Sequence, residues 1–404
     1  MKKRFLSALL CVTMIASLVV GCGAPAAADT TPAATEEAAT EEAATEEATT
    51  EETATEAKGI AVEDIKVGFV HVSDPSDMGY TYNHDLGTLA MQKALGLRDD
   101  QIINKFNVPE GAECDTALRE LVDAGCNIIF ATSFGFENFV KEVAAEYPEI
   151  QFCHATGFQA AGSGLSNMHN YFASIYEARY LAGIAAGLKT ETNKLGYVAA
   201  FPFAEVISGY TAFYLGAKSV NPDVTMDIQY TNSWNDPTKE AQVAKALIEK
   251  GCDVISQHSD STAPATTAED NGVWQVGYNN DMIDAAPNAS LISARIDWGI
   301  YVTEAVQAVI DGETIPADWC KGLADGAVYL SPLNEAIAAE GTQEAIDAAA
   351  EKIKSGELKV FAGPLSGADP DGNAIEVAEG EYFHEQEEAS APSWCYIVEG
   401  CNVE

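Results

Sequence analysis

Basic residues are scarce in this sequence. It contains 22 Lys and Arg against 62 Asp and Glu in 404 residues, which gives a formal net charge of −40 at pH 7. A field of that sign repels phosphate backbones, and no cluster of Lys or Arg offsets it. We therefore expect no nucleic acid partner.

The apolar run at the N-terminus is too short for a membrane span. It extends from Phe5 to Val20, whereas a spanning helix needs roughly 20 residues. Three basic residues precede it and small residues follow it, the layout of a secretory signal. Val19–Cys22 is similar to a bacterial lipobox, in which the cysteine is lipidated. The alternative is an ordinary signal peptide with a stray cysteine. We expect residues 1–21 to be a lipoprotein signal peptide and Cys22 to anchor the protein on the extracytoplasmic face of the cell membrane.

Residues 22–58 lack aromatic and large aliphatic side chains. TEEA repeats begin at Thr35, Thr40 and Thr45. Nothing in this segment can build a core, and charges of one sign repel each other. We expect a solvated linker that holds the folded part away from the membrane.

Motifs of catalytic and metal sites are also missing. There is no CxxC pair, no Cys/His ligand spacing and no GxSxG elbow, and His384-Glu385 lacks the second histidine of a zinc helix. We therefore expect no metal, no cofactor and no catalytic residue, and an extracellular enzyme is the rival class. Cys126, Cys153 and Cys252 lie beside apolar runs and are expected to be buried. For Cys395 and Cys401 the sequence allows either a disulfide or two free thiols.

Residues 59–404 alternate short β-rich runs with helical patterns, which is typical of parallel α/β sheets. Their length exceeds one typical domain and predicts two lobes. Three helical segments should pack one apolar face on the sheets: Leu86, Leu89, Ala90 and Ala94; Leu118, Leu121 and Val122; and Val243, Ala244, Leu247 and Ile248. The expected strands are Ile65–Val72, Ile102–Phe106, Asn127–Ala131, Gln151–His154, Lys194–Ala200, Thr225–Tyr230, Val254–Gln257, Val273–Gly277 and Leu291–Arg295.

The segments that follow these strands are rich in aromatic and acidic residues. Ligands of doubly wound sheets bind outside the carboxyl ends of the strands. Tyr80 and Trp234 lie between turn residues, outside any apolar helix face, so ligand contact is favoured for both. Asp236 and Ser261 are better explained as helix N-caps. Tyr82 and Phe136 fit a core role equally well.

Seven segments are the most distinctive in the chain: Gly79–Asp85, Thr132–Gly135, His154–Gly157, Tyr176–Tyr180, Ser233–Pro237, Gln257–Ser261 and Phe361–Pro364. Together they resemble the basic membrane protein family of ABC-transporter solute-binding lipoproteins, which includes purine nucleoside receptors. The resemblance implies a two-lobe type I periplasmic-binding-protein fold, with two doubly wound parallel sheets joined by a three-crossing hinge. The implied lobes are 59–172 plus about 296–318, and 173–295 plus about 319–404.

The resemblance also implies the ligand and the partners. A purine would stack between Tyr80 and Trp234, while Asp281, Asp260 or Asn280 read its edge. Arg295–Trp298 lacks the lysine that nucleoside receptors use near the sugar, which favours a free base such as adenine. The alternative for Asp281 is that it caps the turn before Met282. The full set of expected ligand-binding residues is Tyr80, Thr81, Ser133, Phe134, Trp234, Asp260, Asn280, Asp281 and Trp298.

A membrane ABC permease is the implied protein partner, and the receptor itself is expected to be monomeric. Sugar binding is an alternative, because Trp, Tyr, Asp and Asn also line carbohydrate sites. A chemosensory receptor is another, because sensing and transport both use hinge closure.

Overall fold

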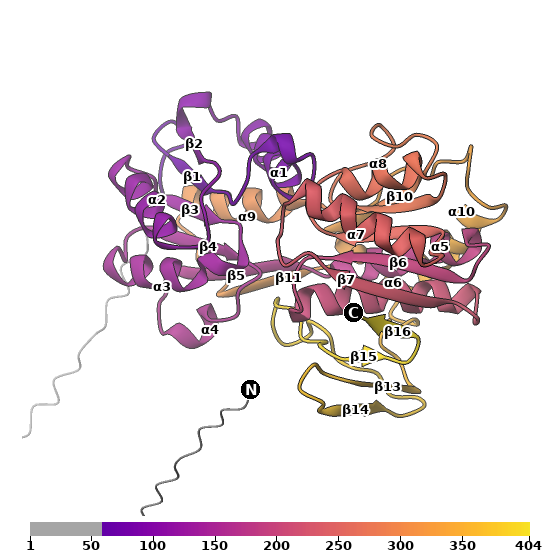
Figure 1. Ribbon diagram of the computed structural model, residues 1–404. Helices are drawn as coiled ribbons and strands as arrows, with labels where there is room; N and C mark the ends of the chain where they lie inside the picture. The colour runs from indigo at the N-terminus through magenta and orange to yellow at the C-terminus, as the bar shows by residue number, and fades with distance from the viewer. Residues whose placement is uncertain (1–58) are drawn as a thin grey trace, which may run out of the picture. The chain divides into compact units, whose positions relative to one another are not determined.

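The structure is a computed structural model that describes residues 59–404 (Figure 1). The expected signal peptide, the Cys22 anchor and the acidic linker lie outside the described residues. The remainder is built around two parallel sheets, and each sheet has helices on both of its faces.

The first sheet has the strand order β11-β5-β4-β3-β1-β2, and every pairing in it is parallel. Its strands are short and mostly apolar because both faces are covered; β1, for example, is buried along its whole length. The elements of this lobe are β1 (Val67–Val70), α1 (Tyr80–Leu95), β2 (Ile102–Lys105), α2 (Ala112–Asp123), β3 (Ile128–Ala131), α3 (Glu137–Glu146), β4 (Gln151–Ala155), α4 (Ala160–Ser163), β5 (Met168–Ala173), α9 (Trp298–Asp311) and β11 (Asp318–Lys321).

The second sheet has the order β12-β10-β9-β8-β6-β7-β16, and only the pairing of β12 with β10 is antiparallel. Its strands β7-β6-β8-β9-β10 repeat the arrangement of β2-β1-β3-β4-β5, so the two halves share one doubly wound topology. The elements are α5 (Ile175–Lys189), β6 (Lys194–Ala199), α6 (Ala204–Val220), β7 (Thr225–Tyr230), α7 (Pro237–Glu249), β8 (Val254–His258), α8 (Ala263–Asp270), β9 (Trp274–Tyr278), β10 (Ser290–Ile296), β12 (Val328–Leu330), α10 (Thr342–Lys354) and β16 (Cys401–Val403).

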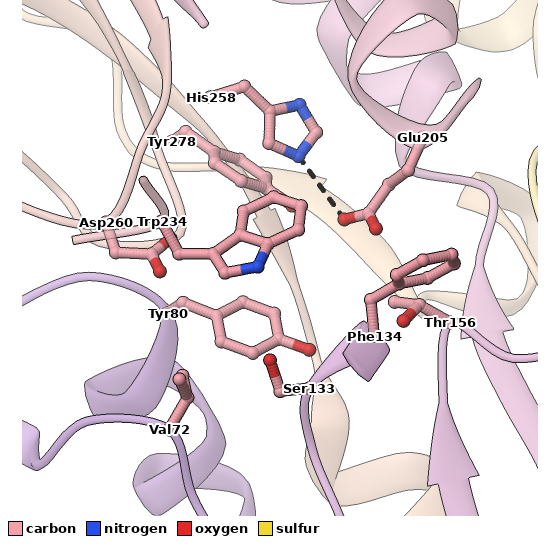
Figure 2. Close-up of a pocket in the computed structure, with 10 residues that line it drawn as sticks. All are labelled: Val72, Tyr80, Ser133, Phe134, Thr156, Glu205, Trp234, His258, Asp260 and Tyr278. Carbon is pink, nitrogen blue, oxygen red and sulfur yellow. Dashed lines mark hydrogen bonds and ion pairs between the residues drawn. The ribbon is translucent and has the colours of Figure 1, made fainter. Parts of the chain in front are cut away.

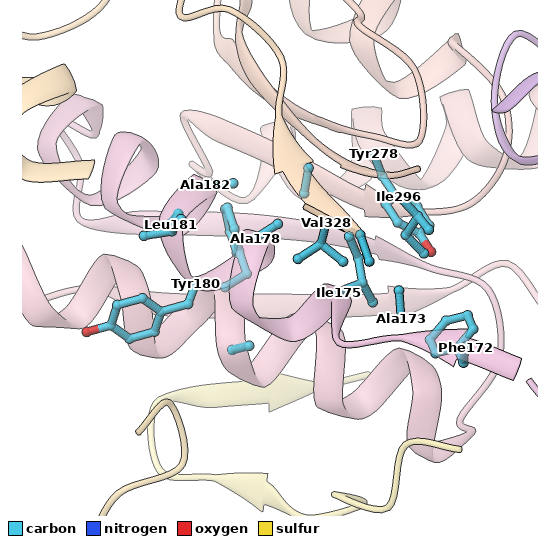
Figure 3. Packing of buried hydrophobic residues seen from close by; sticks show 14 of the residues in the cluster. Phe172, Ala173, Ile175, Ala178, Tyr180, Leu181, Ala182, Tyr278, Ile296 and Val328 are labelled. Carbon is cyan, nitrogen blue, oxygen red and sulfur yellow. The ribbon is translucent and has the colours of Figure 1, made fainter. Parts of the chain in front are cut away.

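The chain crosses between the lobes three times: after β5, after β10 and after β11. Figure 3 shows apolar residues from all three crossings in one cluster, with Ala173 and Ile175 from the first, Ile296 from the second and Val328 from the third. Packing the crossings together gives the lobes a shared hinge. The expected fold class is confirmed. The last crossing follows Lys321, the end of β11.

All nine expected strands are present, with ends that shift by a few residues. Strands β5, β11, β12 and β16 were not expected. Nor was the small antiparallel sheet of β13 (Leu365–Ala368), β14 (Ala374–Val377) and β15 (Ile397–Val398), drawn in yellow in Figure 1. These strands are two to six residues long, and most of them mix polar with apolar side chains, so their pattern in the sequence is weak.

Two of the expected helix faces are confirmed and one is wrong. Leu118 and Leu121 of α2 are buried, as are Ala244 and Leu247 of α7. In α1 the expected face points outward, and Leu89 is 52% exposed. The helix instead buries its Gly87, Thr88 and Met91 side. The absence of a side chain at Gly87 lets α1 pack directly on Trp298 of α9.

The buried cysteines are as expected. Cys126, Cys153 and Cys252 are all enclosed in the cores of the lobes, and burial raises the pKa of each thiol. Cys395 and Cys401 are free thiols in this structure.

Candidate ligand-binding site

A pocket lies between the two lobes, where the carboxyl ends of both sheets face each other (Figure 2). Its lining residues are Val72, Tyr80, Ser133, Phe134, Thr156, Glu205, Trp234, His258, Asp260 and Tyr278.

The strand order explains this position. In each sheet the direction of strand addition reverses beside the first strand, between β1 and β3 in one lobe and between β6 and β8 in the other. Loops diverge at such a switch point and leave a crevice. Ser133 follows β3, Trp234 follows β7, and Asp260 follows β8. The two crevices together form one pocket.

Two aromatic rings form opposite walls of the pocket. Tyr80 comes from the first lobe and Trp234 from the second (Figure 2). Tyr80 packs on His84 of its own lobe, with ring centroids 4.6 Å apart, and Trp234 packs on Phe201 of its own lobe at 5.0 Å. Each ring therefore has an edge-to-face contact with an aromatic ring of its own lobe and also lines the pocket.

Local hydrogen bonds fix Tyr80. The Asp77 carboxylate accepts from the main-chain N–H groups of Gly79, Thr81 and Tyr82, which secures the start of α1. The Tyr80 hydroxyl donates to the carbonyl oxygen of Thr132 at 2.6 Å. The ring is thus held at both ends.

Contacts with the other lobe and a helix cap fix Trp234. Its carbonyl oxygen accepts from the main-chain N–H of Asp260 at 2.9 Å. The next residue, Asn235, donates from its side chain to Ser73 of the first lobe at 3.1 Å. Asp236 then caps α7 by accepting from Lys239 N–H, which confirms its expected capping role. Ser261 lies one residue before the α8 cap and accepts from Ala263 N–H.

The lobes are in contact across the pocket. Gly79 approaches Asp260 so closely that a Cβ atom on Gly79 would overlap the Asp260 carbonyl oxygen. Phe134 of the first lobe stacks on Phe203 of the second at 5.0 Å. The pocket is therefore closed over by both lobes.

Buried titratable groups line the pocket. Burial raises the pKa of Asp260 well above its usual range, and four neighbouring acids add to the effect. Burial raises the pKa of Glu205 to about 7, although Arg179 opposes the rise. Burial and Arg179 both hold the pKa of His258 well below its usual range. His258 is therefore neutral at pH 7, and its contact of 3.3 Å with Glu205 is a hydrogen bond rather than an ion pair.

Arg179 lies behind the pocket wall. Its guanidinium carbon is 3.7 Å from the Tyr278 ring centroid, and it donates to the Tyr197 hydroxyl at 2.6 Å and the Gln257 carbonyl at 2.9 Å. A cation on an aromatic face is stabilised by the ring quadrupole. Arg179 therefore influences the charges of the pocket without lining it.

Several buried polar atoms around the pocket have no partner in the described part of the chain. They include Trp234 Nε1, Thr156 Oγ1, Tyr278 Oη and His258 Nδ1. Leaving a buried donor or acceptor unpaired costs about 1–3 kcal/mol. These groups are suited to a ligand that supplies both donors and acceptors.

Five of the nine expected contact residues line this pocket: Tyr80, Ser133, Phe134, Trp234 and Asp260. Thr81 is buried in the first turn of α1, beside Tyr80. Asn280 and Asp281 line a second cavity, with Tyr82 and Arg295. The Asp281 carboxylate accepts from Ile283 N–H at 3.1 Å, the turn-capping role weighed as its alternative.

Trp298 is a correction to the expected set. It is 1% exposed and stacks on His84 with ring centroids 4.0 Å apart, inside the first lobe. Asp297 caps α9 by accepting from Gly299 N–H. Trp298 is therefore the first residue of the helix, and its side chain lies on the buried face. It supports the wall behind Tyr80, at 6.1 Å from that ring. Phe136 is also buried in the core.

Sequence reasoning missed five lining residues: Val72, Thr156, Glu205, His258 and Tyr278. Glu205 had a usable signal, because the segment Phe201–Glu205 follows β6 and carries two aromatic residues. His258 and Tyr278 are the last residues of β8 and β9, so the rule about carboxyl ends applies to them as well.

Among residues 59–404, no three His, Cys, Asp or Glu side chains gather in a way that could hold a metal ion. The helices of this part of the chain include none with the length and apolar character of a membrane span.

Comparison with known proteins places the chain in a family. Residues 64–362 match the Bmp family, described as PnrA-like ABC transporter substrate-binding proteins. The chain belongs to this family. This Bmp protein is 38% identical to a purine-binding protein of Brucella abortus over 311 residues, 76% of this chain and 86% of the relative. It is 34% identical to a Haloferax volcanii protein named, provisionally, as an ABC transporter glucose-binding protein, over 74% of this chain and 75% of the relative.

Solved structures agree with the Bmp assignment at the level of the fold. An ABC transporter solute-binding protein from Aeropyrum pernix superposes with a TM-score of 0.62 at 20% identity, covering 74% of this chain and 93% of that one. A second one, from Conexibacter woesei, gives 0.61 at 18% identity, covering 73% and 98%. The family resemblance drawn from the sequence motifs is confirmed.

Proposed function

We propose that this Bmp-family protein captures a purine, with adenine preferred, on the extracytoplasmic side of the membrane and delivers it to an ABC permease. The observation that carries the proposal is the pair of aromatic walls, Tyr80 and Trp234, contributed by different lobes to a closed pocket. A flat heterocycle is the ligand that two such walls accommodate best.

Stacking supplies the first part of the binding energy. A base on an aromatic side chain contributes about 1–3 kcal/mol, whichever base it is. Because one wall belongs to each lobe, a stacked ligand contacts both lobes and favours the closed state over the open one. The purine-binding relative from Brucella abortus supports this ligand class.

The polarity of the pocket favours a base over a nucleoside. Asp260 and Glu205 offer carboxyl groups at its edge, and no lysine lines it. These groups can pair with ring nitrogens and an exocyclic amino group.

The anchored location belongs to the same proposal. The lipobox-like Val19–Cys22 and the acidic linker support attachment through Cys22. Closed lobes would present a single joined surface to the permease, whereas open lobes would not. Family membership supports the permease as partner.

A sugar is the second candidate. The glucose-binding name of the Haloferax volcanii relative favours it. Aromatic walls with carboxyl groups can also hold a pyranose ring.

Calorimetry with the purified protein tests both candidates. Adenine, adenosine, guanosine, ribose and glucose are titrated separately, after mass spectrometry has identified any ligand that co-purifies. We expect adenine to bind at least as tightly as adenosine, and ribose and glucose to bind far more weakly. Glucose binding tenfold tighter than any purine would overturn the proposal. Adenosine or guanosine binding tenfold tighter than adenine would overturn the preference for a free base.

A further inference from the structure

Asp260 lies at the interface between the two lobes. It is 4% exposed, its carbonyl oxygen contacts Gly79 of the other lobe, and its carboxyl group lines the pocket beside Trp234 (Figure 2). Opening the lobes would separate Gly79 from Asp260 and admit water to this carboxyl group. Its burial therefore depends on closure.

The surroundings of Asp260 are acidic. Four carboxyl groups act on it electrostatically, each from a different segment: Asp77 before α1, Glu240 of α7, Glu205 of α6 and Glu110 before α2. Among the described residues, no Lys or Arg forms an ion pair with Asp260, and no hydrogen bond reaches its carboxyl oxygens.

The other titratable groups around the pocket do not compensate a negative charge on Asp260. Tyr80 and Tyr278 are neutral phenols whose pKa values are raised by burial, and His258 is neutral. The Arg179 cation is occupied with Tyr197, Gln257 and the face of Tyr278. An ionised Asp260 would therefore be a buried charge among acids, and such a group is neutralised instead.

A neutral carboxyl group recognises a different ligand edge from a carboxylate. The carboxylate only accepts hydrogen bonds, whereas the neutral acid donates one and accepts another side by side. Adenine offers the complement on its major-groove edge, where the N6 amino group is beside the N7 acceptor; on that edge guanine carries two acceptors, O6 and N7.

We propose that Asp260 binds the ligand as a neutral carboxylic acid, taking up one proton as the lobes close, and so selects a purine edge that has an N–H donor beside a ring-nitrogen acceptor. This inference rests on the proposed purine function and specifies its recognition and its dependence on pH.

The direction of the pH effect follows from linkage. Opening would expose the Asp260 carboxyl group to water, and an exposed carboxyl group is ionised near pH 7. In the closed state its pKa is well above the usual range. Closure then binds a proton, so affinity is highest at low pH and falls as pH rises between the usual and the raised pKa, by up to about tenfold per pH unit.

The test is titration calorimetry with adenine from about pH 6 to about pH 8, in two buffers that differ in ionisation enthalpy. Because burial raises the pKa of Glu205 to about 7, Glu205 would also take up protons over this range, so the comparison is made in the Glu205→Gln background. There we expect uptake of close to one proton and an affinity that falls at least tenfold over this range. Adding Asp260→Asn should leave adenine binding at both pH values without that fall. An amide also donates and accepts, so at the higher pH the double variant should bind at least tenfold more tightly than Glu205→Gln alone.

Two further variants locate the proton. Asp223→Asn removes an exposed acid remote from the pocket and should match the wild type. Glu205→Gln should retain the proton uptake. If Glu205→Gln abolishes it while Asp260→Asn keeps it, the proton belongs to Glu205 and the proposal is overturned.

Measurements on the wild type alone also decide the matter. Adenine binding without proton uptake and with equal affinity at both pH values would overturn the role of Asp260 and leave the purine function intact. Absence of any purine binding, with binding of glucose instead, would refute the purine function itself.

Discussion

At the residue scale, Trp234 is the clearest test of stacking. It is half-buried and follows a strand, and its ring faces the pocket. Trp234→Ala should weaken adenine binding by at least about 1 kcal/mol, the lower end of the stacking range. The melting temperature of the unliganded protein should change little. Phe158→Ala removes an exposed aromatic side chain elsewhere and is the control. A large loss of stability with unchanged affinity would make Trp234 a core residue.

The Asp281 carboxylate has two possible roles, ligand recognition and turn capping. Its place after β9 favours a role at the base edge, whereas its bond to Ile283 N–H and its position in a neighbouring cavity favour turn capping. We expect Asp281→Ala to lower the free energy of unfolding by about 1 kcal/mol and to leave adenine affinity unchanged. Denaturant unfolding and calorimetry on the same preparation measure both. A tenfold loss of affinity with unchanged stability would restore the ligand role.

At the element scale, the start of α1 controls how closely the lobes meet. A side chain at Gly79 would overlap the Asp260 carbonyl oxygen of the other lobe. Gly79→Ala should therefore keep the lobes apart and weaken adenine binding about tenfold or more, which is about 1.4 kcal/mol, while each lobe stays folded.

Gly162→Ala provides the matched control, because a Cβ atom there meets nothing within 4 Å. Small-angle scattering with saturating adenine should show a more open Gly79→Ala variant than either wild type or control. A variant that closes and binds like the wild type would show that the contact between Gly79 and Asp260 does not limit closure.

At the scale of the whole molecule, anchoring and binding should be separable. The proposed anchor Cys22 precedes an acidic linker, and the pocket is built from residues 72–278. Cys22→Ala should release the protein from the membrane fraction without changing its affinity for adenine. Fractionation of cells, followed by calorimetry on the released protein, checks both parts. Unchanged membrane association of the variant would refute the anchor.

The sequence by itself determined the architecture. Short apolar strands alternating with helical patterns predict parallel sheets, because a strand buried on both faces needs apolar side chains throughout. The same regularity located Tyr80 and Trp234: both follow strands, and in such sheets the carboxyl ends form the binding edge. Asp236 was also readable, because capping depends on neighbours within one turn. These features are governed by residues close together in the chain.

Only the tertiary structure decided which face of each helix packs on the core and which carboxyl groups are ionised. The α1 face that packs was set by the approach of α9 at Gly87, so Trp298 is buried and Leu89 is exposed. The acidic groups around Asp260 come from segments that are far apart in the sequence, the most distant being that of Asp77. The protonation of a carboxyl group depends on its burial and on nearby charges. Both are properties of the folded chain, since they arise from groups that only folding brings together.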